Sequence, residues 1–300
     1  MRASSLCGSV LLLLTASCDQ LTATMQAVSV LTKTPDLASA QGMDAALQNV
    51  LPLSDVQPEA TLVAVGLAQK KSATSTAAPT PITGAKVFLA WQDQEVKVCE
   101  ETDTKGAYAA TSVPLDPCAD PRLAYVERDK YITRIETGTD LYTMSTTPPA
   151  PVDATAVTFS PPLDATSTIG GTAVSVPHHS LGAELIVDWS ADKAAAKRPT
   201  FAVVARINYT GGNLLDKASW QPDANNFVFD NTAKTPDDMR KLVTDEPESN
   251  VTIPTDTLNA SGLYILVLTT AELSTDVSTN LALGSGSLAG AGVAFVFWVD

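Results

Sequence analysis

The chain has 300 residues, with 33 acidic against 19 basic side chains, which gives a formal net charge of −14 at pH 7. A surface this acidic repels nucleic acids and anionic lipid headgroups, so nucleic-acid binding is excluded. The length suits two ordinary domains. Only 17% of the residues are charged, a composition typical of exported β proteins.

The N-terminal segment has the layout of an export signal. Arg2 is followed by the apolar run Val10–Leu14, which is far shorter than the roughly 20 residues that a membrane-spanning helix needs. Its size is that of a signal-peptide core. The small residues at 15–17 then precede Cys18. This arrangement resembles the lipobox of bacterial lipoproteins, in which a cysteine after a small pair is lipidated and becomes N-terminal.

The resemblance implies a signal peptide over residues 1–17 and a lipid anchor, such as palmitate, on Cys18. Thr15 stands where the family usually has leucine, and an ordinary secretory signal that leaves a soluble protein is the alternative. We expect a protein of the bacterial cell envelope that faces the periplasm or the exterior. The outer membrane is favoured over the inner membrane. Asp19 leaves the inner membrane as an alternative location, because in some bacteria an acidic residue directly after the lipidated cysteine retains lipoproteins in that membrane.

The four cysteines sort by position. Cys7 lies in the signal and Cys18 is the expected anchor, which leaves Cys99 and Cys118. In an oxidising compartment such a pair predicts a disulfide. Two buried thiols or a redox pair are the alternatives, although no Cys-x-x-Cys is present and metal binding lacks nearby histidines.

Between the anchor and the first β pattern, residues 18–58 show no sustained alternation, so we predict a tether with at most a short helix over Met43–Leu51. Short β-rich runs then recur every 8–15 residues between Gly, Pro and Asp, which indicates a sandwich. The predicted strands of this first half cover residues 61–67, 85–91, 96–99, 106–110, 122–126 and 156–159.

Two signatures define this half more closely. Ile82–Leu89 contains a Gly-Ala-x-Val strand, and Thr102–Tyr108 contains a Thr-Asp-x-x-Gly-x-Tyr hairpin. Together they resemble the carboxypeptidase regulatory-like domain, a transthyretin-like β-sandwich, over residues 60 to 160. We expect Asp103 to hydrogen-bond the turn backbone, Gly106 to take a positive φ and Tyr108 to enter the core. The resemblance implies a non-catalytic spacer or binding module; residues 114–118 depart from the family's Gly-containing turn.

A proline-rich zone over residues 146–164 places a domain boundary near residue 165. Period-2 runs follow, at 183–189, 201–207, 227–229, 251–253, 263–268 and 291–299. The Leu-x-Val-x-Trp strand ending at Trp189 and the run at 263–268 resemble a fibronectin-III or other immunoglobulin-like sandwich. The last strand is apolar on both faces, so it should be central or covered.

We therefore predict an all-β chain with two tandem immunoglobulin-like or transthyretin-like β-sandwiches after a lipoprotein signal and tether. The expected divisions are a signal peptide (1–17), a lipid-anchored tether (18–58), a carboxypeptidase regulatory-like sandwich (59–165) and a fibronectin-III-like sandwich (166–300).

Few residues of the sequence point to catalysis or to ligand binding. His178 and His179 follow a proline in a predicted loop; a Ser-His-Asp hydrolase would have to use one of them, and no Gly-x-Ser-x-Gly elbow is present. Residues 284–289 fit Gly-x-Gly-x-x-Ala but precede a strand, so they predict a connection and not a dinucleotide site. The acidic pairs at 237–238 and 245–246 are expected to be solvated loop charge, with a weak calcium site as the alternative.

Three of the four tryptophans fall in strand patterns and are expected in the core, whereas Trp220 is the candidate exposed aromatic. The sequence predicts a non-catalytic cell-envelope lipoprotein that serves as a structural, scaffold or binding module. A carbohydrate- or protein-binding adhesin is the alternative, and a hydrolase using His178 or His179 the remote one. The membrane, through lipid on Cys18, and an unidentified protein or glycan are the expected partners; no cofactor or metal is predicted.

Overall fold

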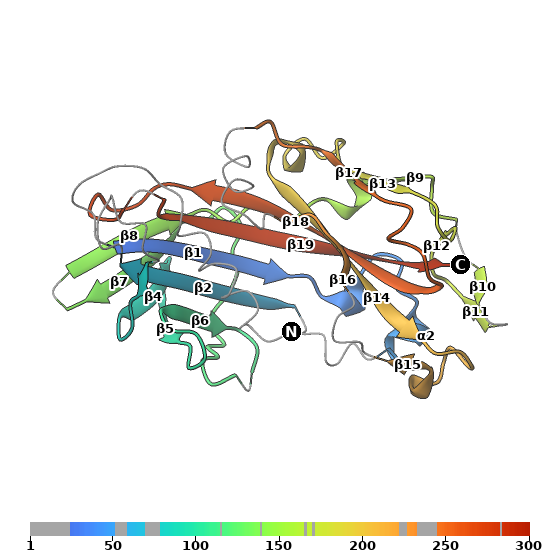
Figure 1. Cartoon of the computed structure of the whole chain (residues 1–300), viewed down its shortest axis with the longest axis horizontal. Helices are drawn as coiled ribbons and strands as arrows, with labels where there is room; N and C mark the ends of the chain where they lie inside the picture. Colours follow the sequence, from blue (N-terminus) through green and yellow to red (C-terminus); the bar gives the residue numbers. More distant parts are fainter. Residues whose placement is uncertain are drawn as a thin grey trace.

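The structure, a computed structural model, describes residues 25–51, 59–69, 79–114, 116–138, 140–164, 167–169, 172–221, 227–232, 245–282 and 284–300. The signal peptide, Cys18, Asp19 and the acidic pair at 237–238 lie outside these residues. Strands dominate the described chain, and the prediction of an all-β sandwich protein is confirmed (Figure 1).

The strands of the first half are β1 (Met25–Thr34), β2 (Ala60–Gln69), β3 (Thr80–Pro81), β4 (Lys86–Trp91), β5 (Gln94–Glu100), β6 (Ala107–Thr111), β7 (Tyr131–Thr137), β8 (Asp140–Thr146) and β9 (Thr158–Ser160). Those of the second half are β10 (Ser167–Ile169), β11 (Thr172–Val174), β12 (His178–His179), β13 (Leu185–Asp188), β14 (Thr200–Tyr209), β15 (Trp220–Gln221), β16 (Phe227–Asp230), β17 (Asn250–Ile253), β18 (Gly262–Ser274) and β19 (Gly286–Val299). The helical pieces are α2 (Ala45–Gln48) and the 3-10 turns η2 (Leu37–Ser39), η4 (Ala154–Ala156), η5 (Ala195–Lys197) and η6 (Lys217–Ser219).

One sheet runs through both halves in the order β15-β14-β18-β19-β1-β2-β6-β5-β4-β7-β8. It curls back on itself, because β8 meets the β18–β19 hairpin: the Ser287 hydroxyl donates to the Ser145 carbonyl (2.6 Å), and the Ser145 amide donates to the Asp276 carbonyl (2.9 Å). The curled part encloses an apolar core to which β1, β2 and β4–β8 all contribute. We call this part the first sandwich.

The second sandwich forms where the sheet β17-β13-β9 packs on β14, β18 and β19. Trp189, Leu185 and Ile253 face Tyr264 and Phe297 across this core, and all five are 0–1% exposed. The opposite face of β18 and β19 is covered by α2, β10–β11 and the segment around β15. The expectation that the last strand is central or covered is therefore confirmed.

The strand β1 corrects the predicted tether. Residues 25–34 pair antiparallel with β2 along their whole length and parallel with β19, so this segment is a central strand and the prediction of a tether is wrong for it. Polar residues inside the strand hide its pattern, since Ser29 is 1% exposed and its hydroxyl bonds that of Thr133 (2.8 Å). The short helix α2 is also packed, with Leu47 fully buried.

Two of the predicted strands differ from the structure. The strand predicted at 122–126 is wrong: the segment is irregular, and Leu123 fills the first core from a loop. The strand predicted at 156–159 is shifted, because η4 occupies 154–156 and β9 begins at Thr158. The boundary near residue 165 stays a prediction, although the main sheet contains strands from both sides of it.

Candidate functional site

Tyr108 joins the two sequence signatures of the first sandwich. It lies on β6 and is 0% exposed, as predicted. Its hydroxyl donates to the Ile82 carbonyl (3.1 Å) and accepts from the Ala85 amide (3.0 Å). Burial raises the pKa of this phenol above its ordinary value, a hydrogen bond from Ala85 lowers it and the charge of Glu100 raises it. The tyrosine therefore fixes the loop before β4 to the β5–β6 hairpin.

The β5–β6 turn is built as expected at its glycine. Gly106 has φ +74°, and a Cβ there would lie 2.6 Å from the Leu67 carbonyl oxygen. The turn is closed by backbone bonds, from the Ala107 amide to the Thr104 carbonyl (3.1 Å) and from the Glu101 amide to the Ala107 carbonyl (2.8 Å). The Asp103 carboxylate accepts from the Thr102 hydroxyl (3.4 Å), so the expected bond from the turn backbone is replaced by a side-chain contact.

Cys99 and Cys118 form a disulfide, with their Cα atoms 6.0 Å apart. It ties β5 to the loop after β6, where the Asp120 amide donates to the Thr111 carbonyl (2.9 Å). A closed loop of this length contributes about 3 kcal/mol in the chain-entropy model. The predicted disulfide is confirmed, and its position marks it as a brace of the first sandwich.

The histidines are held in structural contacts. They form β12, which pairs with the end of β19, so the predicted loop is wrong. His179 is 2% exposed and its Nε2 bonds the Ala183 carbonyl (3.2 Å). His178 Nε2 pairs with the Asp300 carboxylate, which also accepts from Trp298 Nε1 (3.1 Å). Among the contacts of the described residues, neither imidazole meets a serine hydroxyl.

Trp220 is buried, at 3% exposed, which corrects its prediction as an exposed aromatic. Its Nε1 donates to the Leu214 carbonyl (2.8 Å), and its ring lies 5.2 Å from Tyr209 and 6.4 Å from Trp298. The polar residues on both sides of Trp220 favour an exposed position, but the preceding loop with Leu214 covers the indole. Trp91, Trp189 and Trp298 are in the core, as predicted.

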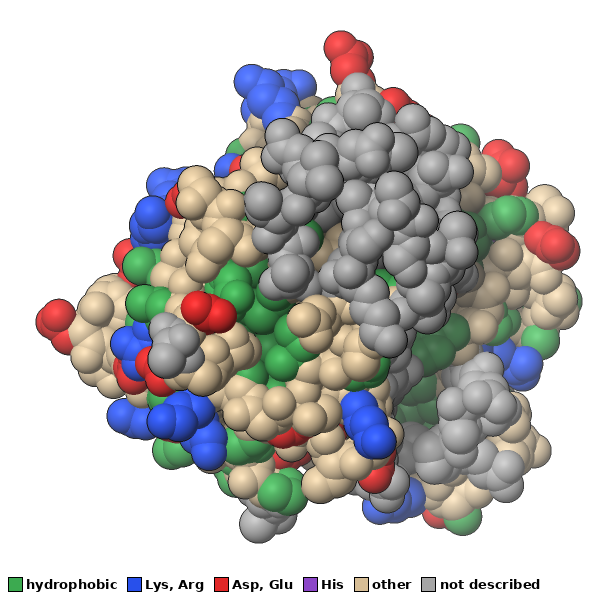
Figure 2. All heavy atoms as spheres, turned by 60° about the vertical axis from the view of Figure 1, so that its left-hand side comes forward, with side chains coloured by type: hydrophobic (Ala, Val, Ile, Leu, Met, Phe, Trp, Pro, Cys, Tyr) green, Lys and Arg blue, Asp and Glu red, His purple; other side chains and the backbone are tan. Residues whose placement is uncertain are grey.

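The outer face of β5, β4, β7 and β8 is the candidate binding surface. The two central cross-strand rows are Lys97, Phe88, Arg134, Thr143 and Glu95, Ala90, Ile132, Ser145. Ile132 and, in the next row, Leu141 are 38% and 53% exposed. Figure 2 turns this end of the molecule forward and shows charged side chains of both signs with hydrophobic patches between them.

Arg134 organises this surface. Its guanidinium lies 4.7 Å from the centre of the Phe88 ring and forms ion pairs with Glu95 (3.1 Å) and Glu136 (3.4 Å). With Lys86 and Lys97, the face carries three basic groups against two acidic ones, so it is close to neutral on a strongly acidic chain. Arginine and aromatic side chains are enriched in protein interfaces, where they supply much of the binding energy.

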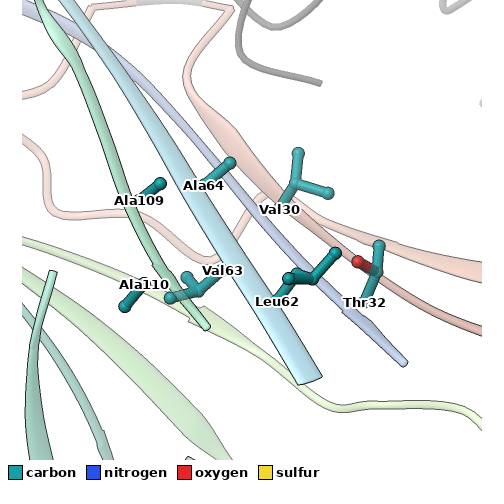
Figure 3. Close-up of a pocket in the computed structure, with 7 residues that line it drawn as sticks. All are labelled: Val30, Thr32, Leu62, Val63, Ala64, Ala109 and Ala110. Atoms are coloured by element: carbon teal, nitrogen blue, oxygen red, sulfur yellow. The ribbon is translucent and has the colours of Figure 1, made fainter. Parts of the chain in front are cut away.

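The outward face of β1, β2 and β6 is lined by small apolar side chains. It carries a shallow depression (Figure 3) lined by Val30, Thr32, Leu62, Ala64 and Ala109 and, from the core side, by Val63 and Ala110. The depression has room for about one water molecule. It is therefore too small to hold an organic ligand.

In the described part of the chain, no group of three or more His, Cys, Asp or Glu side chains is placed to hold a metal ion. Within the same residues, no helix has the length and apolar character to cross a membrane. The Gly-x-Gly-x-x-Ala sequence leads into the strand β19, as predicted. Gly284 lies in the connection before this strand and takes a positive φ of +88°.

No family of known proteins matches this sequence, and none of the curated proteins matches it either. Among solved structures, the chain is similar to the FN1–FN3 domains of chicken CNTN1, at 8% identity and a TM-score of 0.17. The match covers 80% of this chain and 61% of that one, so the chain spans about three fifths of the structure it matches. A likeness at this level carries no inference about fold or function.

Proposed function

We propose that this protein is a non-catalytic module of the bacterial cell envelope, held by lipid on Cys18, that binds a protein partner. The observation that carries the proposal is the lipobox-like end, Leu14-Thr15-Ala16-Ser17-Cys18, followed after seven positions by the first core strand, Met25–Thr34. A cleavage before Cys18 would remove the signal and leave the described fold whole.

The binding role is supported by the outer face of β5, β4, β7 and β8. It combines an arginine stacked on Phe88 with the exposed aliphatic side chains of Ile132 and Leu141. Its near-neutral charge avoids the repulsion that the rest of this acidic chain would exert on an acidic partner. Protein binding is favoured over glycan binding, because Trp220, the candidate exposed aromatic, is buried and offers no face on which a sugar could stack.

The anchor is tested by comparing the native chain with Cys18→Ala in cells supplied with labelled palmitate. We expect label and protein together in the membrane fraction for the native chain. The variant should carry no label and leave the membrane fraction. Unlabelled native protein in the soluble fraction would contradict the anchor.

The binding face is tested with a photo-crosslinking residue at Leu141, and a matched control at Leu181, which is 49% exposed and lies outside this face. We expect a discrete adduct from position 141 that is absent at 181 and weakened by Arg134→Ala. Equal adducts at the two positions, or none at 141, would refute a binding role for this face.

A further inference from the structure

The position of β1 limits where a lipid anchor attaches. Met25 opens the strand and pairs with Gln69, the last residue of β2, while the Ala282 amide donates to the Met25 carbonyl (2.7 Å). Met25 therefore lies at one end of the first sandwich, beside the β18–β19 connection (Figure 1). We call this the hairpin end.

The distance from this end to the anchor is short. Met25 stands seven positions after Cys18, and a fully extended chain covers at most about 3.3–3.6 Å per residue, or about 25 Å here. The predicted tether over residues 18–58 would have allowed any orientation. With β1 in the sheet, the hairpin end stays within about 25 Å of the lipid.

The opposite end lies much farther away. β18 has 13 residues and runs from Gly262 to Ser274, toward the hairpin end. At about 3.3 Å per residue it spans about 43 Å. The second sandwich surrounds the far part of β18 and β19, so its tip around Ser261 is beyond the reach of the Cys18–Met25 segment.

Among the described residues of the hairpin end, acidic side chains outnumber the basic ones, Lys86 and Lys105. The β5–β6 hairpin carries Glu100, Glu101 and Asp103 against Lys105, and Asp140 opens β8 at the same end. Burial, and then the charges of Asp116 and Asp103, raise the pKa of Glu101. These acidic groups are repelled by anionic headgroups, so the proposed attachment is through the lipid on Cys18.

From these features we infer that the hairpin end faces the bilayer and that the second sandwich is presented away from it. This orientation rests on the proposed lipid anchor at Cys18. It fixes a lipid surface as the neighbour of the β18–β19 connection, and it leaves the tip around Ser261 free for contacts outside the membrane.

The orientation is tested by energy transfer from a dye on an introduced cysteine to an acceptor lipid, in vesicles carrying the mature protein. Thr279→Cys and Ser261→Cys place the dye on exposed residues just beyond opposite ends of β18. The native cysteines do not compete, because Cys99 and Cys118 are bonded to each other and Cys18 carries the lipid. We expect strong transfer from position 279 and several-fold weaker transfer from 261.

Equal transfer from both positions, or stronger transfer from 261, would overturn the orientation. Flotation of the same samples separates this result from failure of the anchor. Protein that does not float with vesicles would overturn the proposed function and the orientation that rests on it. As a control, Cys18→Ala should not float with anionic vesicles; if it does, the protein surface itself holds the membrane and the inference is wrong.

Discussion

Replacing Leu31 by alanine tests whether β1 is a central strand of the fold or part of a tether. Leu31 is 1% exposed and lies opposite Val63 of β2 on one side and Ala289 of β19 on the other. Truncating a buried leucine removes its transfer free energy and leaves a cavity, which together cost about 2–5 kcal/mol. A domain is stable by only about 5–15 kcal/mol, so the loss takes a large part of the total.

Urea unfolding followed by tryptophan fluorescence measures the effect, with Lys33→Ala as the matched control on the same strand. Lys33 pairs with Glu59 (2.8 Å), and both side chains are partly exposed, so its loss should cost less than about 1 kcal/mol. If Leu31→Ala unfolds at the same urea concentration as the native chain, β1 is not part of the core and the orientation argued from it has no basis.

Tyr108→Phe should lower the free energy of unfolding by about 1–2 kcal/mol, because the partly buried Ala85 amide and Ile82 carbonyl each lose a partner; no change in urea midpoint would show that the hydroxyl holds nothing. Gly106→Ala combines positive φ with a clash and should cost clearly more than Gly138→Ala, which has φ +60° but open space around the new Cβ; thermal unfolding that ranks them the other way contradicts this. Hydrogen bonds from the Ser175 amide and from the first turn of α2 lower the pKa of Asp44, against the effect of burial. Asp44→Ala should therefore cost about 1 kcal/mol at pH 7. This difference should begin to shrink as the pH falls below about 4, where the carboxyl of the unfolded chain is protonated, and should vanish only below the lowered pKa of the folded Asp44; a difference that persists at still lower pH would point to packing instead.

The sequence predicts the first sandwich well where local pattern and tertiary role agree. Buried and more exposed side chains alternate along β4 and β5, and Gly106 and Tyr108 take the positive φ and the buried position predicted for them. The disulfide is predicted from the expected oxidising compartment and from the even number of cysteines left after Cys7 and Cys18. For the strands, for Gly106 and for Tyr108, the physical reason lies within one short stretch of sequence.

The failures arise where partners are distant in sequence. β1 is hidden because its polar Ser29 is paired with a residue 104 positions away, and no local pattern contains that partner. Leu123 belongs to the core although its loop has no period. Trp220 is covered by a loop that binds its indole, and the histidines pair with the end of β19, which lies far away in the sequence.

The candidate binding face could be predicted only in part. Alternation along β4 and β7 places Phe88 and Arg134 on outward faces, but their contact depends on the register between two strands separated by more than 35 residues. Register is set by the core on the other side of the sheet. The face therefore emerges from the packing of β4–β8 as a whole.

The most direct test of the account is the intact mass of the mature N-terminus, obtained from protein purified out of its native membrane. We predict an N-terminal peptide that begins at Cys18 and is heavier than its amino-acid sequence by the mass of attached acyl chains. An unmodified N-terminus, at Cys18 or at any other residue, would contradict the lipid anchor and the orientation that the short Cys18–Met25 segment imposes.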